Sequence, residues 1–389
     1  MFSDRTNWKL THNRLADALD EARSSGATVL DLTISNPTRA GLHYDEPKIL
    51  QSLAPAQAMD YDPQPKGLAS ARAAVGNYYQ AAHGIKNFDP EHLILTTSTS
   101  EGYSFVFRLL CNPGDELLVP KPSYPLFEFL ADLQDVKLVP YPLIYDHGWQ
   151  IDLPSLQKAV TSLTRGVVVV HPNNPTGSYV HAHELKSLND FCQQHELALI
   201  ADEVFLDYAL DGTTHQSIAA NQDVLSFSLS GVSKISALPQ MKVAWIATSG
   251  PAELAKAAQA RLEVIADTYL SMNAPIQWAT PALLDQRHSI QRQLLDRVRG
   301  NLNELDRQLA GQKACERLIV EGGWYAVLRV PATQTDEDLA VDLLRRKSVL
   351  VHPGHFYDFP RDGYLVLSLI TPRDDFAEAI RRLLKSVDG

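Results

Sequence analysis

The chain has 389 residues, of which 45% are hydrophobic, and a formal net charge of −11 at pH 7. This length allows one large domain or two, and the apolar fraction is ordinary for a globular protein. The acidic balance argues against a surface that binds nucleic acid or anionic membranes, so any bound phosphate must be held by local groups.

The sequence carries no sign of secretion or of membrane insertion. Its first residues lack the basic start and apolar core of a signal peptide, and no apolar run approaches the roughly 20 residues of a membrane helix. Cys111, Cys192 and Cys315 are odd in number and have no motif spacing, which argues against a disulfide framework. No Cys/His cluster has the spacing of a zinc site. We therefore expect a soluble, cytoplasmic protein without a metal.

The predicted elements alternate between helices and short apolar strands. Leu15, Leu19 and Ala22 recur at helical spacing, and a second helix is predicted from about Ser100 to Cys111. The predicted strands are 92–96, 116–119, 136–139, 166–170, 197–200, 224–227 and 243–247. Because unbroken β-branched runs suit strands that are buried on both faces, they predict a mostly parallel sheet in an α/β fold.

The chain changes character after about residue 250. A helical stretch is predicted over 252–309, and two further strands are predicted at 322–328 and 364–369. This pattern indicates a smaller α+β region at the C-terminal end.

Polar residues directly follow several of the predicted strands. They are Thr97 to Ser100, Asn174, Asp202 and Ser230 to Lys234. In open α/β sheets, ligands bind at the carboxyl ends of the strands. An Asn, an Asp and a Lys in this order are the groups needed to hold pyridoxal 5′-phosphate. The Lys amine forms a Schiff base, the Asp faces the pyridine nitrogen, and the Asn donates to the phenolic oxygen.

Several short motifs in a fixed order make the chain resemble the fold-type-I pyridoxal-phosphate enzymes, specifically the class I/II aminotransferases. They are Pro122-Ser123-Tyr124-Pro125, Asn174-Pro175-Thr176-Gly177, Asp202-Glu203-Val204-Phe205, Gly231-Val232-Ser233-Lys234 and Gly322-Gly323-Trp324-Tyr325. Together these motifs are far more specific than any one of them. The resemblance implies a three-layer large domain with a mostly parallel sheet over 45–285. It also implies a smaller α+β domain built from 1–44 and 286–389.

The resemblance also implies roles for individual residues. Lys234 would form the Schiff base and move the proton between the substrate Cα and the cofactor's C4′. Asp202 would keep the pyridine nitrogen protonated, Asn174 would hold the O3′ oxygen, and Tyr124 would stack on the ring. Taken alone, Asp202 would be a good helix N-cap and Asn174 the polar start of a proline turn.

Two further segments are implied to bind the cofactor's phosphate. Thr99 and Ser100 lie where the family has a small-residue turn that opens a helix, although a capping box also explains them. Tyr61 resembles the Tyr that reaches across a dimer interface to the partner's phosphate, which implies a homodimer with shared active sites.

The sequence departs from the family pattern around the cofactor. Lys242 stands where an Arg usually clamps the phosphate, and a Lys lacks the bidentate fork. Gly231 replaces a common phosphate-binding Ser, which leaves Ser230 and Ser233 as substitutes. Phe205 replaces a Tyr that donates to O3′, so we predict that the pKa of the cofactor–lysine adduct differs from that of Tyr-bearing relatives.

A third departure concerns the substrate. Val366 stands where the family places an Arg that binds the amino acid's carboxylate. Either another cation takes the carboxylate, or the amino donor is not an ordinary α-amino acid. Arg39, with Asn36 in the same N-terminal loop, is a candidate, and Arg373 is another, although loop arginines are often simply solvated.

We therefore predict a pyridoxal-phosphate-dependent aminotransferase that exchanges an amino group between an amino acid, or a related amine, and a 2-oxo acid. A lyase or a decarboxylase on the same fold is an alternative, because the pocket selects which bond breaks. A non-catalytic binding protein is a further alternative, which the intact Lys234, Asp202 and Asn174 disfavour.

Overall fold

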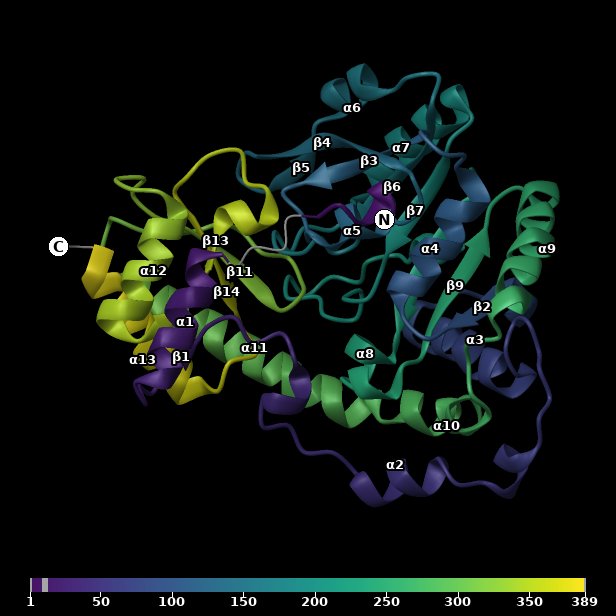
Figure 1. The fold of residues 1–389 in the computed structure, drawn as a ribbon, viewed down its shortest axis with the longest axis horizontal. Coiled ribbons are helices and arrows are strands. Elements are labelled where there is room, and N and C mark those ends of the chain that lie inside the picture. The colour runs from purple at the N-terminus through teal and green to yellow at the C-terminus, as the bar shows by residue number, and fades with distance from the viewer. Residues whose placement is uncertain (1, 9–12, 388–389) are drawn as a thin grey trace.

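The computed structural model describes residues 2–8 and 13–387. Within them, the largest sheet has eight strands in the order β2-β9-β8-β7-β6-β3-β4-β5 (Figure 1). The strands are β2 (Leu93–Thr96), β3 (Glu116–Lys121), β4 (Lys137–Tyr145), β5 (Trp149–Ile151), β6 (Thr164–Val170), β7 (Ala198–Asp202), β8 (Ser226–Gly231) and β9 (Ala244–Ser249).

The sheet is mostly parallel, which confirms the prediction. Neighbours from β8 through β7, β6 and β3 to β4 pair in parallel, whereas β9 is antiparallel to both β8 and β2, and β5 is antiparallel to β4. Two reversals restore the direction, so β2 runs the same way as β8. The carboxyl ends of β2, β6, β7 and β8 therefore lie at one edge.

Helices cover both faces of this sheet. Val168 and Val170 of β6 pack in one core cluster with α4 (Thr99–Leu110), α5 (Leu126–Asp132) and α9 (Ala252–Tyr269). Val167 and Val169 point to the other face and pack with α7 (Ala182–His195) and α6 (Leu153–Ala159), because side chains alternate along a strand. A third cluster on this face joins β2 and β9 to α3 (Ala69–His83) and α10 (Ala274–Asp285). The α2 helix (Glu46–Ser52) contacts α10.

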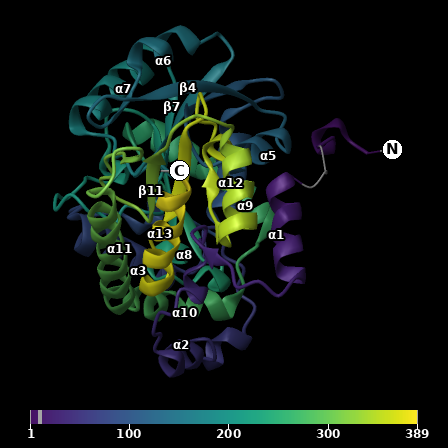
Figure 2. The same cartoon turned by 90° about the vertical axis from the view of Figure 1, so that its left-hand side faces the viewer.

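A smaller body combines the two ends of the chain. Its antiparallel sheet has the order β10-β11-β14-β13, and β1 pairs in parallel with β12. Figure 2 shows four helices in the order α1, α12, α13 and α11 from right to left, each in contact with the next. The elements are α1 (Arg14–Ser24), β1 (Leu30–Asp31), α11 (Arg287–Leu309), β10 (Glu316–Arg317), β11 (Tyr325–Arg329), α12 (Asp336–Lys347), β12 (Val349–Leu350), β13 (His352–Pro353), β14 (Tyr364–Ser368) and α13 (Arg373–Val387).

The core clusters follow this division. Most of one cluster comes from residues 15–44 together with 290–387, while the other three draw on residues 44–284. Phe205, Tyr208 and Ala237 of the large body nevertheless belong to the first cluster. This supports the division at 44/45 and 285/286, which stays a prediction.

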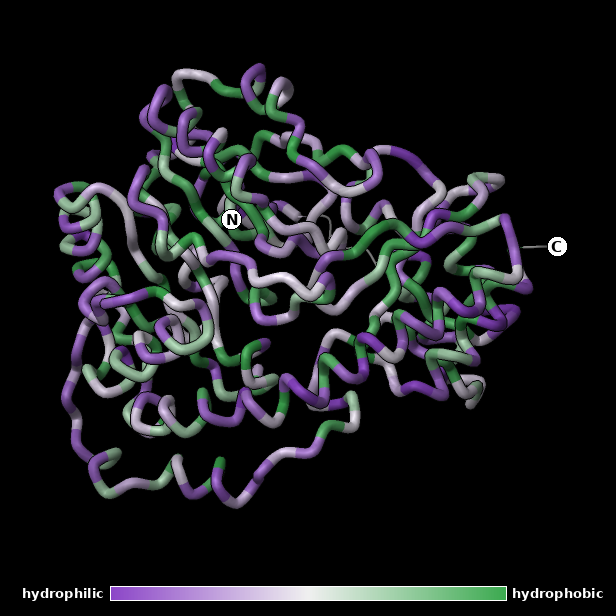
Figure 3. The backbone as a smooth tube through the Cα atoms, turned by 180° about the vertical axis from the view of Figure 1, so that it is seen from behind, coloured by the Kyte–Doolittle hydropathy of each residue, from purple (hydrophilic) through white to green (hydrophobic). Residues whose placement is uncertain are grey.

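Hydrophobic segments gather in the central strands, and the outer helices are mixed in character (Figure 3). Among the described residues, none of the helices is both long enough and apolar enough to cross a membrane.

Candidate active site

A cavity of about 190 Å³ lies at the carboxyl edge of the large sheet. It brings together residues that are far apart in the sequence, because they lie at or just after the carboxyl ends of β2, β3, β6, β7 and β8. Six of the predicted site residues line it, namely Thr99, Tyr124, Asn174, Asp202, Ser233 and Lys234. A larger cavity of about 590 Å³ surrounds Tyr61 elsewhere on the molecule, but it contains none of these six residues.

Lys234 lies in the short helix α8 (Val232–Ile235), which begins directly after β8. Its amine lies 5.4 Å from the ring centre of Phe205 and 5.1 Å from that of Trp324. Burial lowers the pKa of Lys234 to about 8, although the charge of Asp202 acts in the opposite direction. Because an unprotonated amine is the nucleophilic form, this environment makes Lys234 reactive near neutral pH.

Asp202 is the last residue of β7, and its carboxylate is held by two donors. The Tyr103 hydroxyl donates to Oδ2 at 3.1 Å, and the backbone N–H of Val204 donates to Oδ1 at 3.2 Å. Burial raises the pKa of Asp202 to about 6, because it outweighs these bonds and the charge of Lys234. The carboxylate is therefore mostly ionised at neutral pH and faces a cavity, where it can receive a positively charged ring nitrogen.

The Asn174 side chain has an unmet hydrogen-bonding need. Its Oδ1 is buried and has no hydrogen-bond partner among the described residues. Such an orphaned atom costs about 1–3 kcal/mol unless a ligand meets it. Because the oxygen and nitrogen of an amide can exchange places by rotation, Asn174 can offer either a donor or an acceptor to a bound group.

Thr99 is the first residue of α4, a helix whose N-terminus points to the cavity edge. Ser98 caps it, its Oγ accepting from the N–H of Glu101 at 3.2 Å. The N–H groups and dipole at such a terminus favour a phosphate. The carboxylate of Glu101 accepts from the N–H of Thr97 at 2.7 Å, so the predicted capping box is also present in part.

Gly231 explains one departure from the family pattern. A Cβ at this position would lie 2.7 Å from the carbonyl oxygen of Val243 and 3.0 Å from the Cα of Ala244. Both are backbone atoms, so a serine would fit only if β8 and β9 moved apart. Close packing between the two segments therefore requires glycine here.

Four predicted cofactor residues lie outside the lining of this cavity. The Ser230 hydroxyl donates to the carbonyl of Glu203 at 3.3 Å. Lys242 is exposed, with a φ of 53° at the end of a turn. Ser100 belongs to α4 but is absent from the lining, and Tyr61 is 85% exposed in the larger cavity.

The predicted substrate residues also lie outside the lining. Asn36 caps a short 3₁₀ turn, its Oδ1 accepting from the N–H of Thr38 at 3.1 Å, and Arg39 is exposed at the end of that turn. Ser35, from the same loop, does line the cavity. Arg373 forms an ion pair with Asp296 at 2.8 Å.

The lining offers no second cation among the residues that the structure describes. Val366 is buried in β14, opposite Val327 of β11. Among the described residues that line the cavity, Lys234 is the only Lys or Arg.

Sequence analysis assigned no role to several lining residues. Tyr103 and Phe127 line the cavity. Tyr103 follows Thr99 by one turn of α4, whereas Phe127 lies in α5 and Tyr124 precedes that helix. The helical spacing of Thr99 and Tyr103 was the available signal. Tyr325 comes from the small body, and only the packing of the two bodies brings it to the cavity.

Comparison with known proteins identifies the family. The sequence model of the family described as aminotransferase class I and II matches residues 50–383. The chain belongs to this family. It is a pyridoxal 5′-phosphate-dependent aminotransferase, and its fold is that of fold type I.

Individual relatives agree with this assignment. The chain is 31% identical over 373 residues to an alanine aminotransferase of Mycobacterium tuberculosis, covering 92% of this chain and 86% of the relative. It is 28% identical over 379 residues to the glutamate-pyruvate aminotransferase AlaA of Escherichia coli K12, covering 94% and 91%. A crystal structure of an Escherichia coli aminotransferase matches with a TM-score of 0.88 and 26% identity, covering 100% of this chain and 98% of that one. An alanine aminotransferase from Pyrococcus furiosus matches in fold with a TM-score of 0.89 at 22% identity, covering both chains completely.

The cavity suits the cofactor of this family. A buried amine, a buried carboxylate, an orphaned amide and a helix N-terminus meet around one space. These are the groups that an aldehyde, a ring nitrogen, a phenolic oxygen and a phosphate require. The relatives are aminotransferases, so we set aside the alternatives of a lyase and of a non-catalytic protein.

Proposed function

We propose that the protein exchanges an amino group between alanine, or a similarly small amino acid, and a 2-oxo acid in the cavity around Lys234. The meeting of Lys234, Asp202 and Asn174 in one cavity carries this proposal. The printed names of two relatives, alanine aminotransferase and glutamate-pyruvate aminotransferase, support the substrates.

In this proposal each residue has a defined task. The Lys234 amine would hold the cofactor, and the same amine would be the base that moves the proton between the substrate Cα and the cofactor's C4′. A pKa of about 8 suits this task, because a base works best when its pKa lies near the operating pH. The cofactor, when bound, supplies an electron sink for the charge left on Cα.

The other residues hold the cofactor in place. Asp202 would balance the positive ring nitrogen, Asn174 would bond the phenolic oxygen, and Tyr124 would stack on the ring. Thr99, Ser100 and Ser233 contact the phosphate, with Ser230 and Lys242 as further predicted contacts. Thr99 and Ser233 line the cavity, whereas Ser230 and Lys242 do not. The support for a phosphate contact is therefore stronger for Thr99 and Ser233.

A second candidate substrate class is an amine without an α-carboxylate. It is favoured by one observation, that Lys234 is the sole cation among the described lining residues. For a carboxylate donor, we propose that Arg39, with Asn36, supplies the cation, because Ser35 in the same loop already lines the cavity.

A donor screen separates the two classes. The purified protein is supplied with pyruvate or 2-oxoglutarate and with alanine, glutamate or simple amines. Transfer from alanine or glutamate, well above that from the amines, is expected. The Arg39→Ala variant is expected to raise KM for alanine at least about tenfold, as for loss of a charge-assisted bond. Arg373→Ala serves as the control, because Arg373 is already paired with Asp296. Transfer confined to the simple amines would overturn the proposed substrates.

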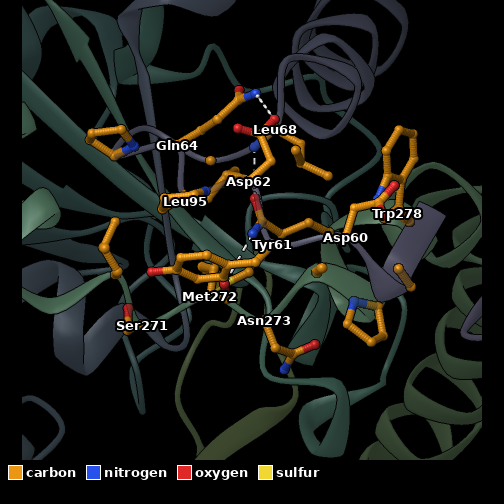
Figure 4. Close-up of a pocket in the computed structure, with 18 of the residues that line it drawn as sticks. Asp60, Tyr61, Asp62, Gln64, Leu68, Leu95, Ser271, Met272, Asn273 and Trp278 are labelled. Atoms are coloured by element: carbon orange, nitrogen blue, oxygen red, sulfur yellow. Dashed lines mark hydrogen bonds between the residues drawn. The ribbon is translucent and has the colours of Figure 1, made fainter.

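We also propose a homodimer in which Tyr61 reaches the phosphate of the partner. Tyr61 and Met59 are 85% and 88% exposed, and both line the cavity of about 590 Å³ together with Trp278. Figure 4 shows Tyr61 beside Met272 in this cavity. Exposed apolar side chains that cluster in this way favour a protein partner. A cytoplasmic location completes the proposal, supported by Cys111 and Cys192, which are outside any disulfide.

A further inference from the structure

The helix that carries Lys234 is too short to hold itself in place. Helix α8 has four residues, Val232–Ile235, and the last four carbonyls of any helix lack partners within it. Its chain then turns at Ala237, whose φ of 51° is a left-handed conformation that alanine rarely adopts. The carbonyl of Lys234 accepts backbone bonds from the N–H of Ala237 at 3.2 Å and from the N–H of Ser236.

Three side chains from outside α8 complete the bonding of this segment. The Tyr208 hydroxyl donates to the carbonyl of Lys234 at 2.6 Å. The Gln291 amide donates to the carbonyl of Ile235 at 2.9 Å, and the Tyr44 hydroxyl donates to that of Ala237 at 2.9 Å. These donors come from the loop after β7, from α11 and from the N-terminal segment.

Tyr208 acts on both ends of the lysine. It is fully buried, and burial raises the pKa of its hydroxyl well above the usual value, so it remains a donor. Its ring centre lies 5.0 Å from that of Trp324 and 6.5 Å from that of Phe205. Those two rings face the Lys234 amine. Tyr208 therefore fixes the peptide of Lys234 and also supports the wall beside its amine.

Gln291 is itself anchored. Its second N–H donates to Oδ2 of Asp207 at 2.5 Å, as the two hydrogens of an amide allow. Oδ1 of Asp207 accepts from the Tyr78 hydroxyl at 2.9 Å and lies 3.0 Å from Nε2 of His83. A buried network thus ties α8 to α3 and α11.

We infer that Tyr208, Gln291 and Tyr44 form a carbonyl clamp, a set of positioning residues that immobilises the Lys234 backbone while its side chain moves. The inference rests on the proposed function, in which Lys234 is the reacting amine. A lysine side chain has four rotatable bonds, so its amine is placed accurately only if its Cα is fixed. A misplacement of about 1 Å in a reacting group can cost about a hundredfold in rate.

The clamp also connects the active site to both passages of the chain between the two bodies. Tyr44 packs against the core clusters of both bodies, and Gln291 lies near the start of α11, just after the second passage. A change in how the two bodies pack would therefore alter the hydrogen bonds that hold α8.

The test compares three Tyr→Phe variants that each remove one phenol-to-carbonyl bond. Tyr208→Phe and Tyr44→Phe remove clamp bonds. Tyr141→Phe is the matched control, because the Tyr141 hydroxyl is buried and donates to the carbonyl of Val168 at 2.7 Å, in a separate core cluster. Thermal melting of each full-length variant checks folding. Tyr44 is only partly buried. If Tyr208→Phe fails to fold, Tyr44→Phe therefore still tests the clamp.

The first measurement uses the full chain stripped of its cofactor. Reductive methylation of Lys234 with formaldehyde is followed across neutral and alkaline pH by peptide mass spectrometry. Loosening α8 admits water and raises the apparent pKa of the amine, so clamp variants are expected to lose about threefold in unprotonated amine at neutral pH, equal to about half a pKa unit. The second measurement is the rate of pyridoxal 5′-phosphate capture, which is expected to fall about tenfold. Tyr141→Phe is expected to change neither.

The outcomes separate the two proposals. If wild-type Lys234 fails to capture the cofactor, the proposed role of Lys234 is wrong. If wild-type Lys234 captures it but the clamp variants behave like Tyr141→Phe in both measurements, the clamp is wrong. In the reconstituted enzyme, the clamp also requires that kcat falls while KM is unchanged, because the defect concerns the base and not substrate binding.

Discussion

At the scale of single residues, the site contains two ionisable side chains, Asp202 and Lys234, whose charged forms are destabilised by burial. Asp202 and Lys234 share one cavity, and burial moves their pKa values toward each other, to about 6 and about 8. Perturbed pairs of this kind concentrate at functional sites, because a general base must titrate near the operating pH. The cofactor relieves part of this cost by bringing a positive ring nitrogen to Asp202.

The first prediction concerns stability against pH in the cofactor-free protein. The folded-state pKa of Asp202, about 6, is above the unfolded value of about 3.9. Between these values the folded state binds more protons than the unfolded state, so the free energy of unfolding falls as pH rises through this window. Glu203, whose pKa burial raises to about 7, contributes with the same sign.

Asp202→Asn is expected to remove the Asp202 part of this loss. Relative to the wild type, the variant should gain up to about 3 kcal/mol in free energy of unfolding between pH 4 and pH 7. Urea unfolding at a series of pH values measures it. Glu203 is present in both proteins, so its contribution cancels except for the part that the charge of Asp202 adds to the raised pKa of Glu203. Parallel pH profiles for the two proteins would contradict the assigned burial of the Asp202 charge.

Much of the site could be predicted from the sequence, because the types of single residues indicate their chemistry. Asn174, Asp202 and Lys234 could be found because each follows an apolar run and has the chemistry that the cofactor needs. The roles of the Tyr103 and Tyr208 hydroxyls could not, although helical spacing places Tyr103 one turn after Thr99, since a tyrosine in a helix or a loop has many roles. Their hydroxyls matter only because folding brings them to Asp202 and to the Lys234 carbonyl.

At the scale of elements, strand positions were readable but strand directions were not. Segment 243–247 was predicted as a strand, and β9 (Ala244–Ser249) is one. It runs antiparallel to its neighbours β8 and β2. An apolar run has the same composition in either direction, so direction is decided by connections and partners.

The second prediction tests the close approach of β8 and β9 at Gly231. Gly231→Ala places a Cβ 2.7 Å from a carbonyl oxygen of the backbone, so the strands must shift. The variant is expected to lose about 1–3 kcal/mol in free energy of unfolding, as overpacked sites do. It should also bind pyridoxal 5′-phosphate less tightly, because α8 begins at the next residue.

Urea unfolding and a cofactor titration check both effects. Gly311→Ala is the matched control, since its added Cβ would meet only the carbonyl oxygen of Gln308 at 3.7 Å. That control is expected to be neutral or slightly stabilising. Equal stability of the two variants would rule out a steric role for Gly231.

At the scale of the whole molecule, the proposed dimer makes a prediction about mixtures. If Tyr61 completes the partner's site, Tyr61→Ala and Lys234→Ala each inactivate a different half of a shared site. Random pairing of the two variants gives mixed dimers in about half of the molecules, and one site in each mixed dimer is intact. Co-expression is therefore expected to restore about a quarter of wild-type activity.

The measurement is transfer activity of the purified mixture against each variant alone. Sedimentation at the same concentration confirms that dimers form. A mixture no more active than the average of the separate variants would show that Tyr61 does not act across an interface.

By itself, the sequence determined the fold class, the family and the central chemistry. Hydrophobic runs and polar residues at strand ends are local features, so they can be recognised in the sequence alone. Tertiary structure alone decided which residues face the cavity, why Gly231 must be glycine, and how Tyr44, Tyr208 and Gln291 hold α8. These are contacts between segments far apart in the sequence, such as the bond from Tyr44 to the carbonyl of Ala237, which joins residues 193 positions apart. Such contacts depend on distances and burial, which no linear pattern encodes.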